Sequence, residues 1–354
     1  MKPKKILHVT NRAERYDGKK FYNLPFKMNH GFVRNGHNVY WFSDRDVAKT
    51  ASLIPSSKFG RAACNKKFIE LCKWFRPDVL ALCHANILTV ETLETVGKML
   101  PGLRVFQYNI DGLYIESNVR YIQSKSHFVK YTFMTSAGSA LNEVGTPDAP
   151  ACFIPNPVDA SIDIYRNWEL TDFHYDLLFV GKRSDWIDPE SLRALAFKLL
   201  PDDPSGLRVL MSNSLWGSEM MAAIGASRMA VCFNQVPPGE QKGDGGKLYL
   251  SSSDRISSCM GNGLLAFTDK SFALAELYGS DALVEVASYD DFREQALFYV
   301  ANDAARIEVA KKGYEISHRE FNEKLVTRYM LERVFEEKLT HPYAWPVDLY
   351  TGQS

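Results

Sequence analysis

One stretch of the chain combines helix-capping side chains with a guanidinium group. Residues 251–254 read Ser-Ser-Ser-Asp and can cap a helix that begins near Arg255, and residues 261–263 supply a turn at its end. The amino end of such a helix carries a positive dipole and backbone N–H groups that favour an anion. The stretch therefore predicts a phosphate-binding helix, although a purely structural capped helix is the alternative. The candidate residues are Lys247, Ser252, Ser253, Asp254, Arg255, Gly261 and Asn262.

A second segment with related chemistry follows the predicted strand Tyr175–Val180. Gly181 permits a tight exit from the strand, and Lys182 and Arg183 place two cations directly after it. Loops at the carboxyl ends of parallel strands line the ligand crevice of an open sheet, so these cations could neutralise a diphosphate. A surface turn with solvated charges is the alternative.

Three carboxylates in the first half of the chain are candidates for proton transfer. Glu14 and Asp17 lie in the long polar loop after the first predicted strand, and Asp111 follows a later strand. A carboxylate in such a place can take a proton from a hydroxyl group or stabilise developing positive charge. For each of the three, a helix cap or a surface ion pair is the structural alternative.

These candidates require strands that end where the loops begin, and the first half predicts such strands. Strands are expected at residues 6–10, 36–42, 79–83 and 104–109, with helices at residues 26–35, 68–75 and 89–100. Strands separated by helices of this length are typical of βαβ units and a parallel sheet.

The second half repeats this alternation after a break near Asn156, which two prolines flank. Strands are expected at residues 175–180, 207–211, 229–233, 263–267 and 282–286, and a mostly helical region follows from Tyr289. We therefore expect a first domain at residues 1–155, a second at 156–320, and a C-terminal helix and tail at 321–354 that cross back to the first domain. The last helix has apolar residues at helical spacing, so it should pack across the two lobes or lie on a membrane surface.

Composition limits the class of protein. A chain of 354 residues is long enough for two domains, and 45% hydrophobic with 24% charged residues is ordinary for a globular protein. Lys and Arg number 42, as do Asp and Glu, which argues against a protein that wraps nucleic acid along a basic face. No stretch reaches the roughly 18 apolar residues of a membrane-spanning helix.

The six cysteines show no C-x-x-C pair and lie mostly in apolar runs, which argues against a zinc site and favours reduced core thiols. The basic start is followed by too few apolar residues for a signal peptide. We therefore expect a cytoplasmic protein, either free or at the inner face of the membrane.

Taken together, these segments resemble bacterial GT-B glycosyltransferases of the CgeB-like, spore-maturation-type group, which are similar to group 1 glycosyl transferases. Residues 22–46 resemble the N-terminal lobe of that group, residues 253–269 its donor-site helix and strand, and residues 289–320 its closing helices. The resemblance covers nearly the whole chain. It implies an α/β fold of two Rossmann-like domains that face each other across a cleft, an acceptor-side domain followed by a nucleotide-sugar domain.

The resemblance implies a metal-independent transferase without a cofactor, because the nucleotide sugar is a substrate. Ser253, Asp254 and Arg255 would help to hold the donor phosphates, and Lys182 and Arg183 would approach from the neighbouring loop. The acceptor would be a glycan or a lipid-linked glycan, such as lipopolysaccharide or capsule, with peripheral membrane contact possible. Many GT-B enzymes carry an acidic residue in the donor helix, whereas this chain has serines at residues 257 and 258. UDP-hexoses, GDP-hexoses and a CMP-activated keto acid therefore remain open as donors.

Two other functions fit the same fold. One is a nucleotide-sugar epimerase or hydrolase, and the other is a non-catalytic protein that binds a nucleotide or a glycan. A nicotinamide dehydrogenase is disfavoured, because no G-x-G-x-x-G follows the first strand.

Overall fold

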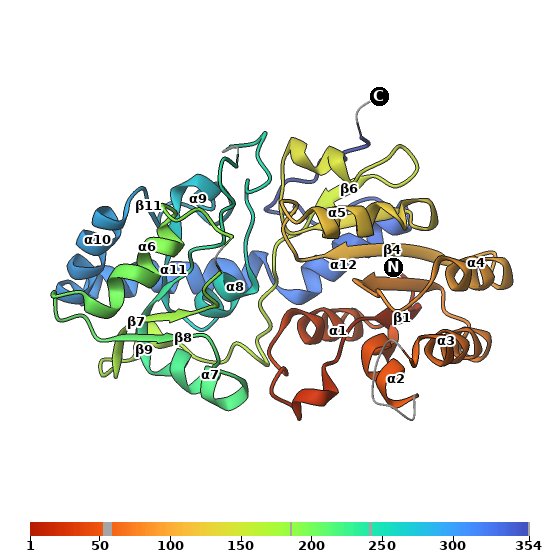
Figure 1. Ribbon diagram of the computed structural model, residues 1–354, viewed down its shortest axis with the longest axis horizontal. Helices are drawn as coiled ribbons and strands as arrows, with labels where there is room; N and C mark the ends of the chain where they lie inside the picture. Colours follow the sequence, from red (N-terminus) through yellow and green to blue (C-terminus); the bar gives the residue numbers. More distant parts are fainter. Residues whose placement is uncertain (52–58, 185, 241–242, 353–354) are drawn as a thin grey trace. The chain divides into compact units, whose positions relative to one another are not determined.

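The computed structural model describes residues 1–51, 59–184, 186–240 and 243–352, and Figure 1 shows its elements. The chain divides into two compact units. Unit 1 comprises Met1–Met134, Leu141–Ile154 and the chain from Glu323 onward, whereas unit 2 comprises Thr135–Ala140 and Pro155–Asn322. The segment Thr135–Ala140 thus groups with the second unit, although the sequence placed it inside the first domain.

Unit 1 contains a six-stranded parallel sheet in the order β2-β1-β3-β4-β5-β6. Its strands are β1 (Lys5–Val9), β2 (Asn38–Phe42), β3 (Val79–Cys83), β4 (Arg104–Asn109), β5 (Tyr131–Met134) and β6 (Ala151–Phe153). The apolar run of β3 is buried along its whole length, as expected for a central strand that helices cover on both faces. The sequence predicted the first four strands and missed β5 and β6.

Helices cover both faces of this sheet. They are α1 (Leu24–Arg34), α2 (Asp44–Thr50), α3 (Arg61–Phe75), α4 (Val90–Met99), α5 (Glu116–Gln123) and α12 (Glu323–Val334). Side chains of α2, α3 and α4 pack against Leu7, Val9 and Leu82 in one buried cluster. On the opposite face, Phe32 of α1 and Tyr329 of α12 contact the rings of Phe106 and Phe133, respectively.

The helix α12 joins unit 1 although it is far away in the sequence. It packs against α1, β4 and β5, and Figure 1 shows it running behind β4. Arg34 of α1 forms a 2.6 Å ion pair with Glu323, the first residue of α12. Most side chains of α12 are buried in this packing, so the helix does not offer the apolar face that a membrane-surface role would need.

Unit 2 repeats the architecture with a five-stranded parallel sheet in the order β11-β10-β9-β7-β8. Its strands are β7 (Tyr175–Val180), β8 (Val209–Ser212), β9 (Ser227–Val231), β10 (Leu265–Asp269) and β11 (Val284–Val286). Its helices are α6 (Leu192–Leu199), α7 (Gly217–Gly225), α8 (Asp254–Gly261), α9 (Ala275–Tyr278), α10 (Tyr289–Ala301) and α11 (Asp303–Glu320). Side chains of α6, α10 and α11 share one buried core with the sheet. No helix in the described ranges is long and apolar enough to span a bilayer.

The contact between α1 and α12 depends on a glycine. A Cβ atom at Gly31 would lie 2.2 Å from the backbone oxygen of Glu323 and 2.7 Å from Oγ1 of Thr327. We expect Gly31→Ala to lower the free energy of unfolding by roughly 1–3 kcal/mol, because the two helices must separate. Denaturant unfolding measures this change.

A matched substitution provides the control. Gly97 lies in α4, and a Cβ atom there would meet nothing within 4 Å. Gly97→Ala should therefore raise stability by roughly 0.5–1 kcal/mol, since alanine is the better helix former. Equal effects of the two substitutions would contradict the close packing of α1 on α12.

Candidate functional site

Strand order gives each unit one point at which a ligand is expected. In unit 1 the chain moves from β1 outward to β2 and then returns to β3 on the other side of β1. In unit 2 the same reversal separates β7 from β9. Open parallel sheets bind ligands outside the carboxyl ends of the strands at such a reversal. The relevant loops are therefore those that follow β1 and β3, and those that follow β7 and β9.

In unit 2 a buried arginine joins these two loops. Arg193, on the first turn of α6, is 3% exposed. Its Nη2 donates to the backbone oxygen of Lys182 after β7 (2.9 Å), and its Nη1 donates to the backbone oxygen of Phe233 after β9 (2.8 Å). A Cβ atom at Gly181 would lie 2.5 Å from Nη2 of Arg193, so glycine is needed for this approach.

A second guanidinium group reaches the same carbonyl. Nη1 of Arg255, on the first turn of α8, donates to the backbone oxygens of Phe233 (3.1 Å) and Val231 (3.4 Å). Two like charges that share one acceptor repel each other, and an anion relieves that repulsion. The end of β9 is therefore the strongest candidate anion site in the described part of unit 2.

The amino end of α8 adds a hydroxyl group to this site. Ser253 is the N-cap residue, and its Oγ is buried without a hydrogen-bond partner among the described residues. The neighbouring Ser252 has a structural role, since its backbone and side-chain oxygens accept from Nδ2 of Asn156 at 2.6 and 3.2 Å. Asp254 is exposed. Ser253 is thus the capping residue best suited to contact a ligand.

The other predicted residues of unit 2 differ in their exposure and in their contacts. Lys182 and Arg183 are exposed in the loop after β7. Lys247 is partly buried, and its backbone N–H donates to Oε1 of Glu240 at 3.0 Å. The loop of Lys182 is therefore joined through Arg193 to the carbonyl of Phe233.

Gly261 and Asn262 are not at the amino end of α8. They lie at its carboxyl end, about 12 Å along a helix of eight residues. Asn262 is fully buried and donates to the backbone oxygen of Ser258 (2.7 Å). A Cβ atom at Gly261 would lie 2.8 Å from Val158. Both residues hold the fold, and their contact with a donor stays a prediction.

In unit 1 a histidine and a carboxylate meet at the carboxyl edge of the sheet. His84 directly follows β3, and its Nε2 lies 3.8 Å from Oδ2 of Asp111, which follows β4. The backbone N–H of Asp111 donates to Oδ1 of Asn109 at 2.9 Å, which fixes the turn. Burial lowers the pKa of His84, while the negative charge of Asp111 opposes that shift. A neutral imidazole beside a carboxylate is suited to accept a proton.

The backbone at His84 is unusual and is held by a lysine. His84 and Ala85 have positive φ angles of 56° and 46°, a conformation that non-glycine residues rarely adopt. Nζ of Lys125, which is 3% exposed, donates to both of their backbone oxygens at 2.9 Å. The hydroxyl of Tyr121 also donates to the oxygen of His84. Burial lowers the pKa of Lys125 to about 7. These contacts fix the direction of the imidazole.

The remaining two predicted carboxylates have local contacts. Glu14 and Asp17 are exposed, at the start of a short 3₁₀ turn (Glu14–Tyr16) and just after it. Glu14 lies 3.6 Å from Arg12 in an exposed ion pair, and its backbone N–H donates to Asp46 at 3.1 Å. The contacts given for these residues do not join them to His84 or Asp111.

The sequence reading missed Arg193, His84 and Lys125. His84 follows a predicted strand directly, so the rule that selected Asp111 could also have selected His84. Arg193 lies on α6 beside Leu192 and Ala196, and a lone arginine on an apolar helix face was the available signal. Among the described residues, no three His, Cys, Asp or Glu side chains gather closely enough to hold a metal ion.

Comparison with known protein families gives one match. Residues 172–332 match a family model described as "Glycosyl transferase-like". This region includes β7 to β11, Arg193 and α8. No curated protein matches the chain.

Solved glycosyltransferase structures share the fold over nearly the full chain. AviGT4, a glycosyltransferase involved in avilamycin A biosynthesis, is 14% identical with a TM-score of 0.59, covering 94% of this chain and 98% of its own. The catalytic domain of starch synthase IV from Arabidopsis thaliana, bound to ADP and acarbose, is 10% identical with a TM-score of 0.61, covering 95% and 99%. Anabaena HepE in complex with UDP is 12% identical with a TM-score of 0.55, covering 94% and 100%. The expected fold class of two Rossmann-like α/β domains, as in GT-B glycosyltransferases, is confirmed.

Proposed function

We propose that this protein transfers a sugar from a nucleotide-activated donor to a glycan or a lipid-linked acceptor. The observation that carries the proposal is the pair of guanidinium groups, from Arg193 and Arg255, on the backbone oxygen of Phe233. The pair lies at the strand-order reversal of the unit that matches the glycosyl transferase-like model. A nucleoside diphosphate is the anion that a glycosyl transferase-like protein would bind at this reversal.

Unit 2 is the nucleotide-sugar domain in this proposal. Arg255 and Arg193 neutralise the phosphates of the leaving nucleotide, and the buried hydroxyl of Ser253 donates to a phosphate oxygen. Lys182 and Arg183 add charge from the loop after β7. Four cationic side chains supply the charge stabilisation that a metal ion would otherwise give, so we propose a metal-independent reaction without a cofactor.

Unit 1 is the acceptor-side domain. We assign the role of base to His84, which takes the proton of the acceptor hydroxyl while Asp111 stabilises the resulting imidazolium. Glu14 and Asp17 are further candidate carboxylates of this domain; both are exposed and have local contacts. Lys125 is a positioning residue, since its Nζ donates to the backbone oxygens of His84 and Ala85 and to the hydroxyl of Tyr121.

We also propose a finer identity for this enzyme. We place the enzyme in the CgeB-like group, in the cytoplasm, with lipopolysaccharide, capsule or a similar glycan as the product. The six cysteines are free and buried, which suits a reducing compartment. On α3, Lys66, Lys67 and Lys73 are exposed, and Nζ of Lys73 lies 5.5 Å from the ring centre of Trp74, which is 77% exposed. We propose that this helix makes peripheral contact with an anionic membrane.

Nucleotide binding followed by turnover tests the proposal. One of UDP, GDP, CMP or ADP should raise the melting temperature of the protein, because a ligand that binds only the folded state stabilises it. Arg255→Ala should remove that shift and reduce sugar transfer by at least about 100-fold, since a charge-assisted contact to the leaving group is lost. Arg319→Ala is the matched control, because Arg319 is exposed and its side chain forms an ion pair with the neighbouring Glu320.

Other outcomes identify the competing functions. Tight nucleotide binding without turnover of any donor would indicate a non-catalytic binding protein, and conversion of the nucleotide sugar without an acceptor would indicate an epimerase or hydrolase. Absence of nucleotide binding, or unchanged binding in Arg255→Ala, would contradict the donor site.

The pH dependence of the reaction tests the base. Burial lowers the pKa of His84 below its usual 6.5, so the imidazole is neutral at pH 7. We therefore expect kcat/KM to fall only when the pH drops below 6.5 and the imidazole becomes protonated. Asp111→Asn removes the charge that raises this pKa, so the acid limb of the profile should move to lower pH. His84→Gln should abolish that limb and lower kcat/KM by roughly 10²- to 10⁴-fold. The control is His127→Gln, at an exposed residue of unit 1, which should leave the pH profile unchanged. An acid limb that stays in place in both Asp111→Asn and His84→Gln would rule out His84 as the base.

A further inference from the structure

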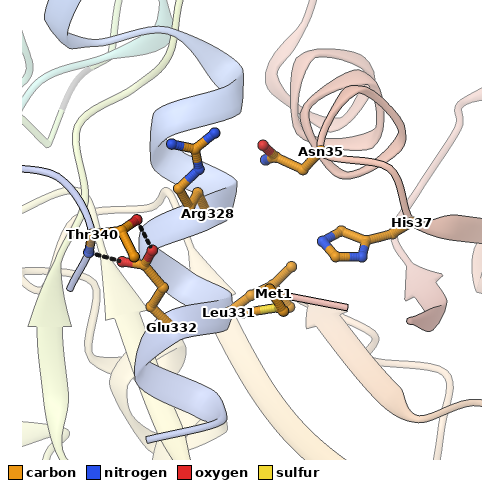
Figure 2. Close-up of a pocket in the computed structure, with 7 residues that line it drawn as sticks. All are labelled: Met1, Asn35, His37, Arg328, Leu331, Glu332 and Thr340. Carbon is orange, nitrogen blue, oxygen red and sulfur yellow. Dashed lines mark hydrogen bonds between the residues drawn. The ribbon is translucent and has the colours of Figure 1, made fainter. Parts of the chain in front are cut away.

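Unit 1 contains a cavity that the proposed transfer reaction does not use. It has a volume of about 220 Å³ and lies where the end of α1, the start of β2 and α12 meet. Its polar lining is Asn35, His37, Arg328, Glu332 and Thr340. Figure 2 shows the side chains of Asn35, His37 and Arg328 around a common space, whereas Glu332 turns toward Thr340.

Arg328 lacks the partner that its position on α12 would provide. Glu332 lies four residues later, at the spacing that favours an ion pair on a helix. The carboxylate of Glu332, however, accepts from the backbone N–H and the hydroxyl of Thr340 and from the hydroxyl of Tyr343. Within the described chain, the half-buried guanidinium of Arg328 therefore has no hydrogen bond or ion pair.

His37 offers a second donor to the same space. Its ring is 8% exposed, and its Nδ1 accepts from the backbone N–H of Lys4 at 3.2 Å. The proton of the neutral ring is therefore on Nε2, which has no partner among the described residues. Asn35 cannot provide a third N–H group, because Nδ2 already donates to Lys324 and Thr327 at 2.8 and 2.9 Å.

The charge of the cavity favours an anion. Arg328 contributes a full positive charge, and the side chain of Lys4 lies nearby, with Nζ 4.3 Å from the ring centre of Phe335. Glu332 is the opposing charge, and three donors already share its oxygens. A planar guanidinium fork beside an imidazole N–H matches two oxygens of one oxyanion.

Size limits the ligand further. Pockets for drug-sized ligands measure roughly 300–1,000 Å³, so this cavity is too small for a nucleotide sugar. We propose that it binds a small oxyanion, a phosphate or a carboxylate, through Arg328 and His37, at a site separate from the donor site. Because α12 supplies Arg328 and α1 precedes His37, the bound anion also links these two helices and stabilises unit 1.

Titration with inorganic phosphate tests the proposal. The titration uses the full chain carrying Arg255→Ala, so that phosphate binding at the proposed donor site is removed from the measured response. In the reference series, chloride replaces phosphate at constant ionic strength. Phosphate should raise the melting temperature in a saturable way. Adding Arg328→Met should weaken phosphate binding by about tenfold or more, the loss expected for a hydrogen bond to a charged group.

The control and the second variant separate this site from general salt effects. Arg120→Met removes a cation of unit 1 that is 69% exposed and should leave the phosphate response intact. Arg328→Lys keeps the charge but loses the fork, so it should bind with intermediate affinity. Malonate in place of phosphate distinguishes the two ligand classes. A larger shift in melting temperature with malonate than with phosphate would identify a carboxylate as the ligand. Equal responses in all variants, or no response to either oxyanion, would overturn the proposal.

Discussion

The backbone oxygen of Phe233 is the point on which the organisation of unit 2 depends. It accepts from Arg193 and from Arg255, so one carbonyl joins the end of β9 to the first turns of α6 and α8. Each hydrogen bond from a charged donor contributes roughly 1.5–3 kcal/mol, and the cost of bringing two cations together remains until an anion binds. In the proposed donor site, the two cations are therefore held in an arrangement that stays electrostatically unfavourable until an anion binds.

Unit 1 also has a basic side chain that donates to backbone oxygens at the carboxyl edge of its sheet. There the ammonium of Lys125 donates to the backbone oxygens of His84 and Ala85, which occupy a sparsely populated backbone conformation. Strained residues persist only where surrounding contacts fix them, and such residues concentrate at functional sites. In both units a buried cation holds a loop that follows a central strand, and the exposed chemistry depends on that buried support.

The sequence predicted the elements with strong local signals and missed those that depend on tertiary contacts. The strands β3, β4 and β7 were predicted with their observed bounds. By contrast, β5 and β6 have only four and three residues and gain order from pairing with neighbours. The sequence also placed residues 261–263 at the end of the predicted helix, and Asn262 follows α8 at the end opposite Arg255. Arg193 and Lys125 act on carbonyl groups that are distant in sequence, and no local pattern identifies such pairs.

Hydrogen–deuterium exchange with and without bound nucleotide tests the central claim most directly. The donor phosphates should slow the exchange of backbone amides at residues 181–184, after β7, and at residues 253–256, at the amino end of α8. The amides at residues 84–86 of unit 1 provide an internal reference for that change. Nucleotide binding that slows exchange in unit 1 while leaving both segments of unit 2 unchanged would contradict the assignment of the donor site to the two guanidinium groups at Phe233.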